Sequence, residues 1–583
     1  MLRKQKIIFS LLLLILLSLP ALKALAGSGF YTSHDGFEHL PRLAQYISAL
    51  KEGQIPPRWA GTLVGRLGSP LFVYSYQLPY ILGSLPYFAG FSLPASLKLV
   101  FGLSFVISGI GTFFWLKEYF STKASFLGAL FFLYAPYRFI MIYVRAVAGE
   151  LLALAILPFI LLFITRLIKT PNLKNVVWLG LSFGSSIIAH TLFLPMYLPI
   201  IFSYLIFAII ADQKSHPRYS LSRKITIPLL GLTLGIGLSA FSLFPVVFEG
   251  EYIAFDQFGS NLAEGHLVEL WQLIHSPWGY GFSHPGIIED AMSFQVGLTQ
   301  ILVFFMSLAL ILLSSIPLKV TRSVFAFIGK KINLAQFGGA ILTIAWFTLA
   351  VFLMLNIEPT KWVWRTLPGI SVIDIPWRFL GLTTLAASFL AAFVADGLKK
   401  PWLVVISLTL IVLFANRNHL RINQPVFFND QHYQNDMGTT TFSNEYRPIW
   451  RSSNSTEPVT PRFYPLNYAD KAKVIENTGT KLVAQADFPE STRVQLNILY
   501  FPGWHIYLQQ GNQWQEQLVG KEVTIVNQAV ANWKVSEVEG TMQLSIPAGP
   551  QTLRVVFGET PLRKSADYIS LVSFLILPVL FFI

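Results

Sequence analysis

The stretch Ser33-His34-Asp35-Gly36-Phe37-Glu38-His39-Leu40-Pro41-Arg42 directly follows the first hydrophobic segment of the chain and gathers acid–base side chains and an arginine. Leu40, Leu43, Ile47 and Leu50 recur at helical spacing. We therefore expect an amphipathic helix that lies on a membrane surface with its polar side facing water.

Asp35 has two interpretations on residue type alone. An acidic residue in the first external loop of a protein with many membrane helices suggests a catalytic base for glycosyl transfer. Asp35 with Glu38 also fits a helix capping box of the form D-x-x-E, which is a purely structural role.

Composition places the chain among membrane proteins. It has 583 residues, of which 53% are hydrophobic, 15% aromatic and only 13% charged. It contains no cysteine, which excludes disulfides, thiolate zinc sites and cysteine nucleophiles. The formal net charge of +13 is compatible with nucleic-acid binding, but the positions of the basic residues favour another explanation, given below.

Apolar runs long enough to cross a bilayer recur along most of the chain, since a spanning helix needs about 20 apolar residues. The stretch 71–91 is apolar but contains Pro79, Gly83 and Pro86, so we expect a re-entrant or interfacial piece there. Twelve spans are predicted, at about 7–22, 95–117, 122–138, 150–168, 174–191, 193–211, 225–248, 294–316, 336–356, 378–395, 401–416 and 566–583.

The basic residues predict the orientation of these spans, because lysine and arginine concentrate in cytoplasmic loops. They cluster in every second turn, at 117–123, 166–174, 214–224, 319–331 and 399–400. The N-terminus is therefore predicted to be cytoplasmic, and the loops 27–94 and 249–293 and the segment 417–565 external. This explains the positive charge without nucleic acid, and the absence of a Walker-type glycine-rich loop argues against direct use of a nucleotide.

The first segment, 1–26, has a second interpretation. Ala24-Leu25-Ala26 resembles a signal-peptidase site, so cleavage remains open. We favour a retained helix, because the later helices need a neighbour to pack against.

The segment 417–565 is predicted to form a separate β-rich domain after a membrane domain at 1–416, with a last membrane helix at 566–583. Val494 to Tyr500 alternates with period two, and Val523–Val526, Met542–Ile546 and Leu553–Phe557 resemble further strands. We expect an antiparallel sandwich or barrel-like module.

Two arginines are candidates for holding a phosphate, because a guanidinium presents a planar fork of donors. Arg145 lies in the turn after the third span together with Glu150, and Arg378 opens the tenth span next to Asp374. The structural alternative for Arg145 is an internal ion pair with Glu150.

Other polar residues of the external side are weaker candidates. His190 closes the fifth span and is either a functional group or a satisfied core histidine. Glu249 follows the seventh span, and histidines and acids lie further along the same loop. Such residues can ligate a divalent cation, but no spacing matches a defined site, so the metal requirement is left open.

Several motifs together resemble a bacterial and archaeal membrane-protein family labelled 6-pyruvoyl-tetrahydropterin synthase-related. The resemblance covers almost the whole chain, although no soluble zinc-binding core supports the pterin part of that label. The motifs are His34-Asp35 with His39 and Arg42, Gly53 to Trp59, Tyr143 with Arg145 and Glu150, Ile375 to Phe379, Tyr500 to Trp504, and Thr560 to Arg563 followed by Ile569-Ser570-Leu571.

The resemblance implies a branch of the GT-C superfamily, which are multi-span glycosyltransferases that use polyprenyl-phosphate sugars and carry an acidic residue in the first external loop. Pro41 departs from the pattern, because a proline should kink or restart the helix just after His39. Carried over, the resemblance assigns catalysis to Asp35, Glu38 and His39 and the donor phosphate to Arg145, Arg378 and Arg42.

We therefore expect a multi-pass protein of the cell membrane that moves a hexose or pentose from a polyprenyl-phosphate donor to an external glycan, lipid or protein. Two alternatives are kept. A non-catalytic scaffold that binds lipid or glycan would retain the same fold. A transporter is disfavoured, because no internal repeat is visible and the ionisable residues cluster on one side.

Overall fold

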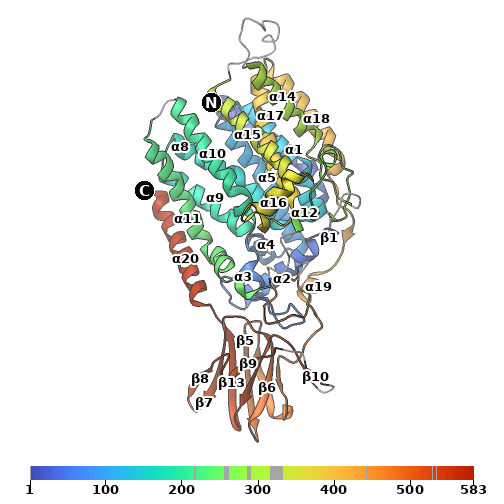
Figure 1. The fold of residues 1–583 in the computed structure, drawn as a ribbon, viewed down its shortest axis with the longest axis vertical. Helices are drawn as coiled ribbons and strands as arrows, with labels where there is room; N and C mark the ends of the chain where they lie inside the picture. Colours follow the sequence, from blue (N-terminus) through green and yellow to red (C-terminus); the bar gives the residue numbers. More distant parts are fainter. Residues whose placement is uncertain are drawn as a thin grey trace.

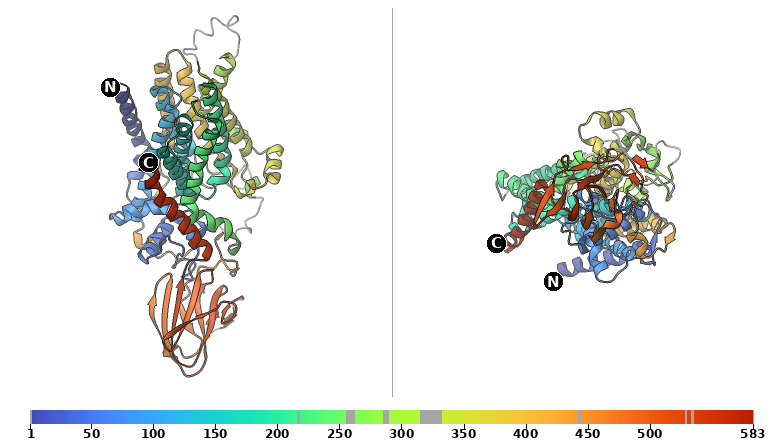
Figure 2. Two further views of the ribbon diagram at one scale, coloured as in Figure 1. Left: turned by 90° about the vertical axis from the view of Figure 1, so that its left-hand side faces the viewer. Right: turned by 90° about the horizontal axis from the view of Figure 1, so that it is seen from below.

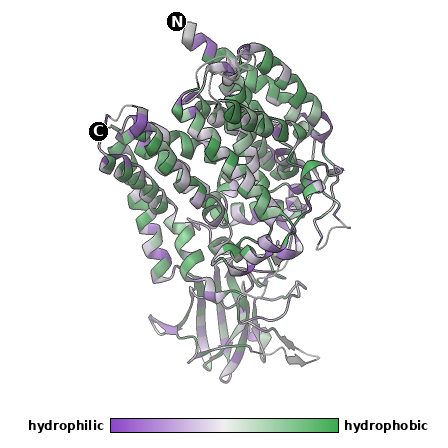
Figure 3. Ribbon diagram, turned by 45° about the horizontal axis from the view of Figure 1, so that its top comes forward, coloured by the Kyte–Doolittle hydropathy of each residue, from purple (hydrophilic) through white to green (hydrophobic). Residues whose placement is uncertain are grey.

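The computed structural model describes residues 2–215, 218–254, 262–284, 290–314, 332–441, 444–527, 530–532 and 535–582. A long bundle of helices stands on a smaller β domain, and the helix that ends the chain returns along the side of the bundle (Figures 1 and 2). Hydrophobic residues dominate the helical part, as Figure 3 shows. The chain is thus a polytopic helical membrane protein with a C-terminal β-rich domain.

Within the described residues, nine helices are long and apolar enough to cross a membrane, and a bent pair, 122–133 with 136–145, raises the number to ten. Two shorter apolar helices, α9 and α14, have 17 residues each. Together these occupy the twelve predicted spans. The helices are α1 (Leu2–Leu22), α5 (Leu93–Lys117), α6 (Thr122–Leu133), α7 (Pro136–Phe139), α8 (Ala148–Lys169), α9 (Leu173–Ala189), α10 (Phe193–Ser215), α11 (Leu221–Phe248), α14 (Leu298–Ser314), α15 (Leu334–Met354), α17 (Leu380–Gly397), α18 (Pro401–Asn416) and α20 (Pro561–Phe582).

The helices differ in how deeply they lie in the bundle. The apolar windows of α17 and α8 are 94% and 83% buried inside the protein, whereas those of α1 and α20 are 17% and 11% buried. Helices α8 and α17 therefore form the centre, and α1 and α20 present most of their surface to lipid. The basic residues at 319–331 that helped to predict the orientation lie outside the described residues.

Small residues allow the close approach of α9 and α11. A Cβ added at Gly184 would lie 2.8 Å from the Gly235 carbonyl oxygen, which is inside contact distance. This is the packing expected of membrane helices, where apolar surface alone gives no preference for a helix over lipid.

The stretch 71–91 forms two short helices, α3 (Leu71–Tyr74) and α4 (Leu78–Phe88), neither of which is long enough to span a bilayer. They lie beside α2 (Gly36–Lys51) at the end of the bundle that faces the β domain (Figure 1). A two-residue strand, β1 (Phe30–Tyr31), precedes α2 and pairs with β2 (Pro425–Val426).

Two expectations for α2 were wrong. Its polar side does not face water, because His39, Arg42 and Gln45 are only 1%, 4% and 3% exposed. Pro41 does not restart the helix, which continues as one segment from Gly36 to Lys51. The helix is embedded in protein on both faces rather than floating on a membrane surface.

The loops on the same side carry short helices, and the long segment before the β sheets is mostly irregular. The short elements are α12 (Leu262–Gly265), α13 (Leu270–Ile274), α16 (Glu358–Thr366), the 3-10 turn η7 (Pro376–Phe379) and α19 (Asp430–Gln434).

The β domain contains a four-stranded and a five-stranded antiparallel sheet, in the orders β3-β6-β12-β9 and β4-β5-β13-β7-β8. Alternate residues of β5 are buried, among them Leu482, Ala484 and Ala486, as the period of two requires. The strands are β3 (Phe463–Pro465), β4 (Ala472–Asn477), β5 (Lys481–Phe488), β6 (Thr492–Leu499), β7 (Trp504–Gln510), β8 (Gln513–Gln517), β9 (Val523–Ile525), β10 (Val530–Asn532), β11 (Val535–Glu537), β12 (Thr541–Ile546) and β13 (Gly549–Phe557).

The last helix begins five residues before the predicted 566, at Pro561. The Thr560 hydroxyl accepts a hydrogen bond from the Arg563 N–H (3.2 Å), which is a helix start that hydropathy does not register because the first turn is polar.

Candidate functional site

Asp35 is held by its backbone against the end of the bent span. The N–H groups of His34 and Asp35 donate to the carbonyls of Val144 (3.1 Å) and Arg145 (2.8 Å), the last residues of the π-helical turn η2 (Ile140–Arg145). The next residue, Ala146, has a φ of 57°, so the chain turns sharply there into α8. The first external loop is therefore fixed beside the candidate phosphate ligand Arg145.

The Asp35 side chain is free for chemistry. The backbone carbonyl of Asp35 accepts hydrogen bonds from the N–H groups of Glu38 (3.1 Å) and His39 (2.9 Å), and these bonds begin α2. Its carboxylate makes no capping hydrogen bond and has no hydrogen-bond or ion-pair partner within the described part of the chain. The capping-box interpretation is therefore wrong, and a partly exposed carboxylate remains.

Arg145, Glu150 and Arg378 form a buried ion cluster next to Asp35. Arg145 Nη1 lies 2.9 Å from Glu150 Oε2, and Arg378 Nη1 lies 4.0 Å from the same oxygen. The Tyr137 hydroxyl donates to the other Glu150 oxygen. The Arg145 guanidinium also lies over the Trp377 ring, 4.7 Å from its centre. The internal pair considered for Arg145 is thus present, and Trp377 stacks on it instead of merely anchoring a loop.

Among the described residues Arg145 forms its hydrogen bonds through Nη1 alone, and Arg378 also keeps an unbonded donor. Arg378 pairs with Asp374 (3.1 Å), whose side chain is 38% exposed, and its Nη1 lies 3.5 Å from His190 Nε2. Its buried Nε has no hydrogen-bond partner among the described residues. Arg378 therefore retains donor capacity, and the candidates Glu150, His190 and Asp374 all belong to its surroundings.

His39 is buried, and both of its ring nitrogens form hydrogen bonds. Its Nε2 accepts from the Ala148 N–H (3.3 Å), so its Nδ1 carries the proton and donates to the Tyr80 hydroxyl (2.8 Å). Burial and the nearby Arg42 lower the pKa of His39 well below its usual range, which keeps the ring neutral. His39 thus joins α2, α4 and α8 and has no free lone pair for a substrate.

Tyr76 and Tyr80 escaped the sequence analysis, because Tyr76 lies before α4 and Tyr80 within it, and no local pattern connects the two. Tyr76 stacks on His190 with ring centres 5.3 Å apart, and Tyr80 binds His39. Burial raises the pKa of both tyrosines, and the nearby Asp35 raises it further.

Arg42 is not placed to receive a phosphate. Its Nε donates to the Thr440 carbonyl (2.8 Å), its Nη2 donates to the same carbonyl, and Nη2 lies 3.5 Å from Glu38. It fastens the segment around Thr440 over α2. Burial raises the pKa of Glu38 to about 8, against the opposing effect of Arg42 and with the help of Asp35 and Glu445.

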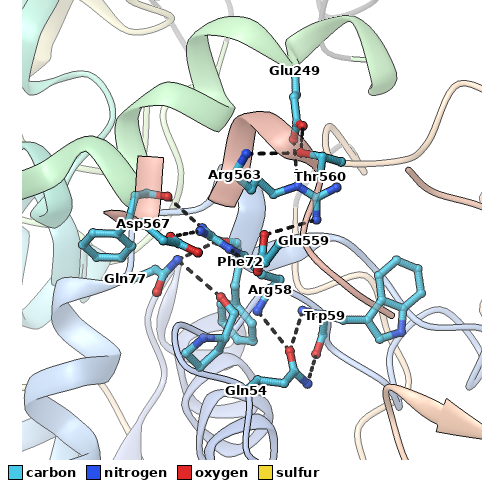
Figure 4. A network of polar contacts seen from close by, with 12 residues as sticks. Gln54, Arg58, Trp59, Phe72, Gln77, Glu249, Glu559, Thr560, Arg563 and Asp567 are labelled. Atoms are coloured by element: carbon cyan, nitrogen blue, oxygen red, sulfur yellow. Dashed lines mark hydrogen bonds and ion pairs between the residues drawn. The ribbon is translucent and has the colours of Figure 1, made fainter. Parts of the chain in front are cut away.

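Glu249 belongs to a different cluster (Figure 4). It pairs with Arg563 of α20 (3.0 Å) and accepts from the Thr560 hydroxyl (2.5 Å). Arg58 continues this network to Glu559 (3.1 Å) and Asp567 (2.7 Å). Glu249 therefore joins the last helix to the membrane domain, which makes it a structural residue.

The same junction explains three of the sequence motifs. Trp59, which follows Arg58, packs edge-on against Trp504 with ring centres 5.3 Å apart. Arg563 Nη2 donates to the Pro502 carbonyl, and its guanidinium lies over Phe501 (5.5 Å). The motifs Gly53 to Trp59, Tyr500 to Trp504 and Thr560 to Arg563 thus form one joint between the first external loop, the β domain and α20.

Asp35 belongs to no metal-ligand cluster among the described residues, and it lines neither of two hollows that they form. Within the described ranges no group of three or more His, Asp or Glu side chains is placed to hold a metal ion. A hollow of about 670 Å³ lies on the β domain, and a cavity of about 480 Å³ lies between α2 and the β domain. Neither is lined by Asp35, Glu150 or Arg378.

No protein-family model matches the chain. An uncharacterized protein of Lactococcus lactis subsp. cremoris (strain MG1363) is 29% identical over 226 residues, which are 37% of this chain and 36% of that protein. The match therefore spans little more than a third of the relative's length.

Solved structures of an oligosaccharyltransferase from Archaeoglobus fulgidus are similar over much of the chain. The apo form has a TM-score of 0.43 and 13% identity, and the match covers 78% of this chain and 61% of that chain. Its complex with an inhibitory peptide and a dolichol-phosphate has a TM-score of 0.35 and 12% identity, with 77% and 61% covered. Because these scores are low, the function is argued below from the site itself.

Proposed function

We propose that the protein is a GT-C-like membrane glycosyltransferase that moves a sugar from a polyprenyl-phosphate donor to an external acceptor. The observation that carries the proposal is the pairing of a free, partly exposed carboxylate with a buried arginine cluster. Asp35 is bonded through its backbone to Arg145, and Arg145 shares Glu150 with Arg378. A base and a phosphate-binding arginine are the two groups that transfer from a phosphate leaving group requires.

Arg378 would hold the donor phosphate. Its buried Nε has no partner among the described residues, and its exposed partner Asp374 is the contact most easily exchanged for a phosphate oxygen. Arg145, neutralised by Glu150 and stacked on Trp377, would orient Arg378 through the shared carboxylate. Pre-placed cations act strongly on a leaving phosphate, because no reorganisation is needed when its charge develops.

Asp35 would act as the general base. It removes the proton from an acceptor hydroxyl, and that oxygen forms a bond to the anomeric carbon from the face opposite the phosphate. The bond between the anomeric carbon and the phosphate oxygen breaks, and the phosphate leaves with the electron pair beside Arg378. The product carries inverted anomeric configuration, and Asp35 ends protonated.

Glu38 and His39 have supporting roles in this proposal. Glu38, whose pKa is about 8 because of burial, can exchange a proton near neutral pH one helical turn from Asp35. His39, neutral and bonded to Ala148 and Tyr80, keeps α2 in register with α8. Neither residue needs to touch the donor.

The membrane placement follows the same scheme. The donor lipid lies between helices, and the N-terminus is cytoplasmic with the β domain outside, as the basic loops predict. The proposal also places the chain with the membrane-protein family labelled 6-pyruvoyl-tetrahydropterin synthase-related, on the motifs quoted above. No nucleotide is required, because the donor sugar is already activated.

Mass spectrometry of lipids bound to the purified protein tests the donor. The wild type should retain a polyprenyl phosphate or its glycoside. Arg378→Ala should lose most of it, and Arg378→Lys should retain less than the wild type, because a point charge replaces a bidentate fork. Lys361→Ala is a control, since Lys361 pairs only with the exposed Glu358 (3.2 Å) among the described residues. A wild type free of such lipids, or equal retention in all variants, contradicts the proposal.

A further inference from the structure

One face of α2 is polar along its whole length. Asp35, Glu38, Arg42, Gln45 and Glu52 follow one another at intervals of three, four, three and seven residues, which places them on one side of a helix. The opposite side carries the apolar residues that pack into the protein core. The polar face therefore runs from the candidate base at the start of α2 to Glu52 directly after its end.

The cavity between α2 and the β domain lies at the far end of this polar face. Its volume is about 480 Å³, within the range of about 300–1,000 Å³ typical of ligand pockets, and domain boundaries are a common place for such pockets. Thirteen residues separate Asp35 from Ser48, which is about 20 Å along a helix. The lining comes from α2, the first external loop and the β domain: Gln45, Ser48, Ala49, Glu52, Gln54, Trp59, Gly61, Thr62, Arg66, Thr460, Pro461, Arg462, Phe463, Val474, Asn477, Thr478 and Gly479.

The walls of the cavity are held rigidly. A Cβ on Gly479 would lie 3.3 Å from the Gly61 Cα, so the two segments touch backbone to backbone. Glu52 accepts a hydrogen bond from the Gly479 N–H (3.0 Å). Arg462 donates to the Asn477 side chain (2.9 Å) and to the Gly479 carbonyl (3.3 Å). The cavity is thus part of the contact between the membrane domain and the β domain, and hydrogen bonds fix the segments that line it.

The lining retains hydrogen-bonding capacity. The buried Arg462 Nε and Thr62 Oγ1 have no partner among the described residues. The Gln45 side-chain oxygen accepts only a long bond from the Thr62 N–H (3.4 Å). Arg66 is exposed and forms no ion pair with any described carboxylate. Amides, hydroxyls, a carboxylate and a guanidinium beside aromatic rings are groups that can share hydrogen bonds with vicinal hydroxyls.

We propose that this cavity binds a segment of the acceptor carbohydrate, at a distance from the sugar hydroxyl that reacts at Asp35. A lipid tail would leave the buried Arg462 Nε and Thr62 Oγ1 without hydrogen-bond partners. The Arg462 Nη groups already donate to the Asn477 side chain and the Gly479 carbonyl, which disfavours a compact phosphate. The assignment of the glycan as acceptor rests on the proposed function. The segment around Thr440 covers α2 between the two places, so the acceptor passes over it.

Binding of defined tetrasaccharides to the full-length protein in lipid nanodiscs tests the site. The probes are maltotetraose, chitotetraose and tetragalacturonate, titrated to millimolar concentrations and followed by calorimetry. At least one should bind the wild type. Ser48→Trp, which fills the cavity, should weaken that binding about tenfold or more, a change of about 1.4 kcal/mol. Ser48→Leu fills less and should weaken it by a smaller factor.

Lys51→Trp is the matched control, because Lys51 is an exposed residue of the same helix that does not line the cavity. It should bind as the wild type does. Failure of all three saccharides to bind, or binding that survives Ser48→Trp, overturns the proposal.

The two proposals fail separately. Asp35→Asn should bind the saccharide normally while losing transfer, since about 20 Å separates the two places. If the wild type binds the saccharide normally but transfers no sugar, the cavity is a glycan site and the proposed glycosyltransferase activity is wrong. If transfer depends on Asp35 but Ser48→Trp leaves the KM for the acceptor unchanged, the proposed activity holds and the cavity is not an acceptor site.

Discussion

Replacing Asp35 with asparagine separates catalysis from structure more cleanly than any other change in the site. The carboxylate makes no capping hydrogen bond, so neither Asp35→Asn nor Asp35→Ala removes a contact that stabilises α2. We expect the free energy of unfolding to change by less than about 0.5 kcal/mol in both variants. If Asp35 were a side-chain cap, the alanine variant alone would lose about 1 kcal/mol.

The expected effect on the rate is much larger. Loss of a general base costs about 10²- to 10⁴-fold in rate, which corresponds to roughly 3–5 kcal/mol of transition-state stabilisation. Both variants should still retain the donor lipid, because Arg378 and the Arg145–Glu150 pair are untouched.

The assay follows the loss of the copurified glycolipid by mass spectrometry after acceptor membranes are added, with thermal unfolding measured on the same samples. Glu38→Gln is the companion variant, because Glu38 is the neighbouring carboxylate of the same helix face. Near-normal turnover in Asp35→Asn, with Glu38 intact or replaced, would refute the mechanism.

Three further predictions concern Glu38, Glu249 and the orientation of the chain in the membrane. Burial raises the pKa of Glu38 to about 8 in the folded protein, from its usual value of 4.5. Between these two pH values the folded state binds a proton that the unfolded state has lost, so the free energy of unfolding should fall as pH rises from about 4.5 to about 8. Glu38→Gln should flatten this slope in thermal melts. Glu249→Gln leaves the buried Arg563 without its nearest counter-charge and should cost about 3–5 kcal/mol, whereas Glu358→Gln, at an exposed pair, should be nearly neutral. Reporter fusions should read cytoplasmic after Asp212 and external after Gly438, and a cytoplasmic signal after Gly438 would overturn the orientation.

The site itself was only partly predictable. Arg145, Glu150, Arg378, His190 and Asp374 were chosen one by one, and the structure brings all five together. Arg42 and Glu249 are as buried as Arg145 and Glu150, at 4% exposed each, yet they hold the segment around Thr440 and the last helix. Residue type alone does not distinguish these cases, because burial of a charge is compatible with a ligand site and with an internal pair.

The sequence by itself determined which segments enter the membrane and which form the β domain. Both follow from local patterns: apolar runs of about 20 residues for spans and alternation with period two for strands. The interrupted stretch 71–91 was recognised in the same way, from its prolines and glycine.

Only the tertiary structure decided what the polar residues do. Asp35 matches a capping box in sequence, but its backbone is drawn to Val144 and Arg145 and its carboxylate stays free. The motifs around Trp59, Trp504 and Arg563 lie more than five hundred residues apart at their extremes and meet in one joint. A hydrogen bond or ion pair depends on atoms within about 3–4 Å, and packing of distant segments sets those distances, whereas a local pattern reports only how a segment meets lipid, water or its own neighbours.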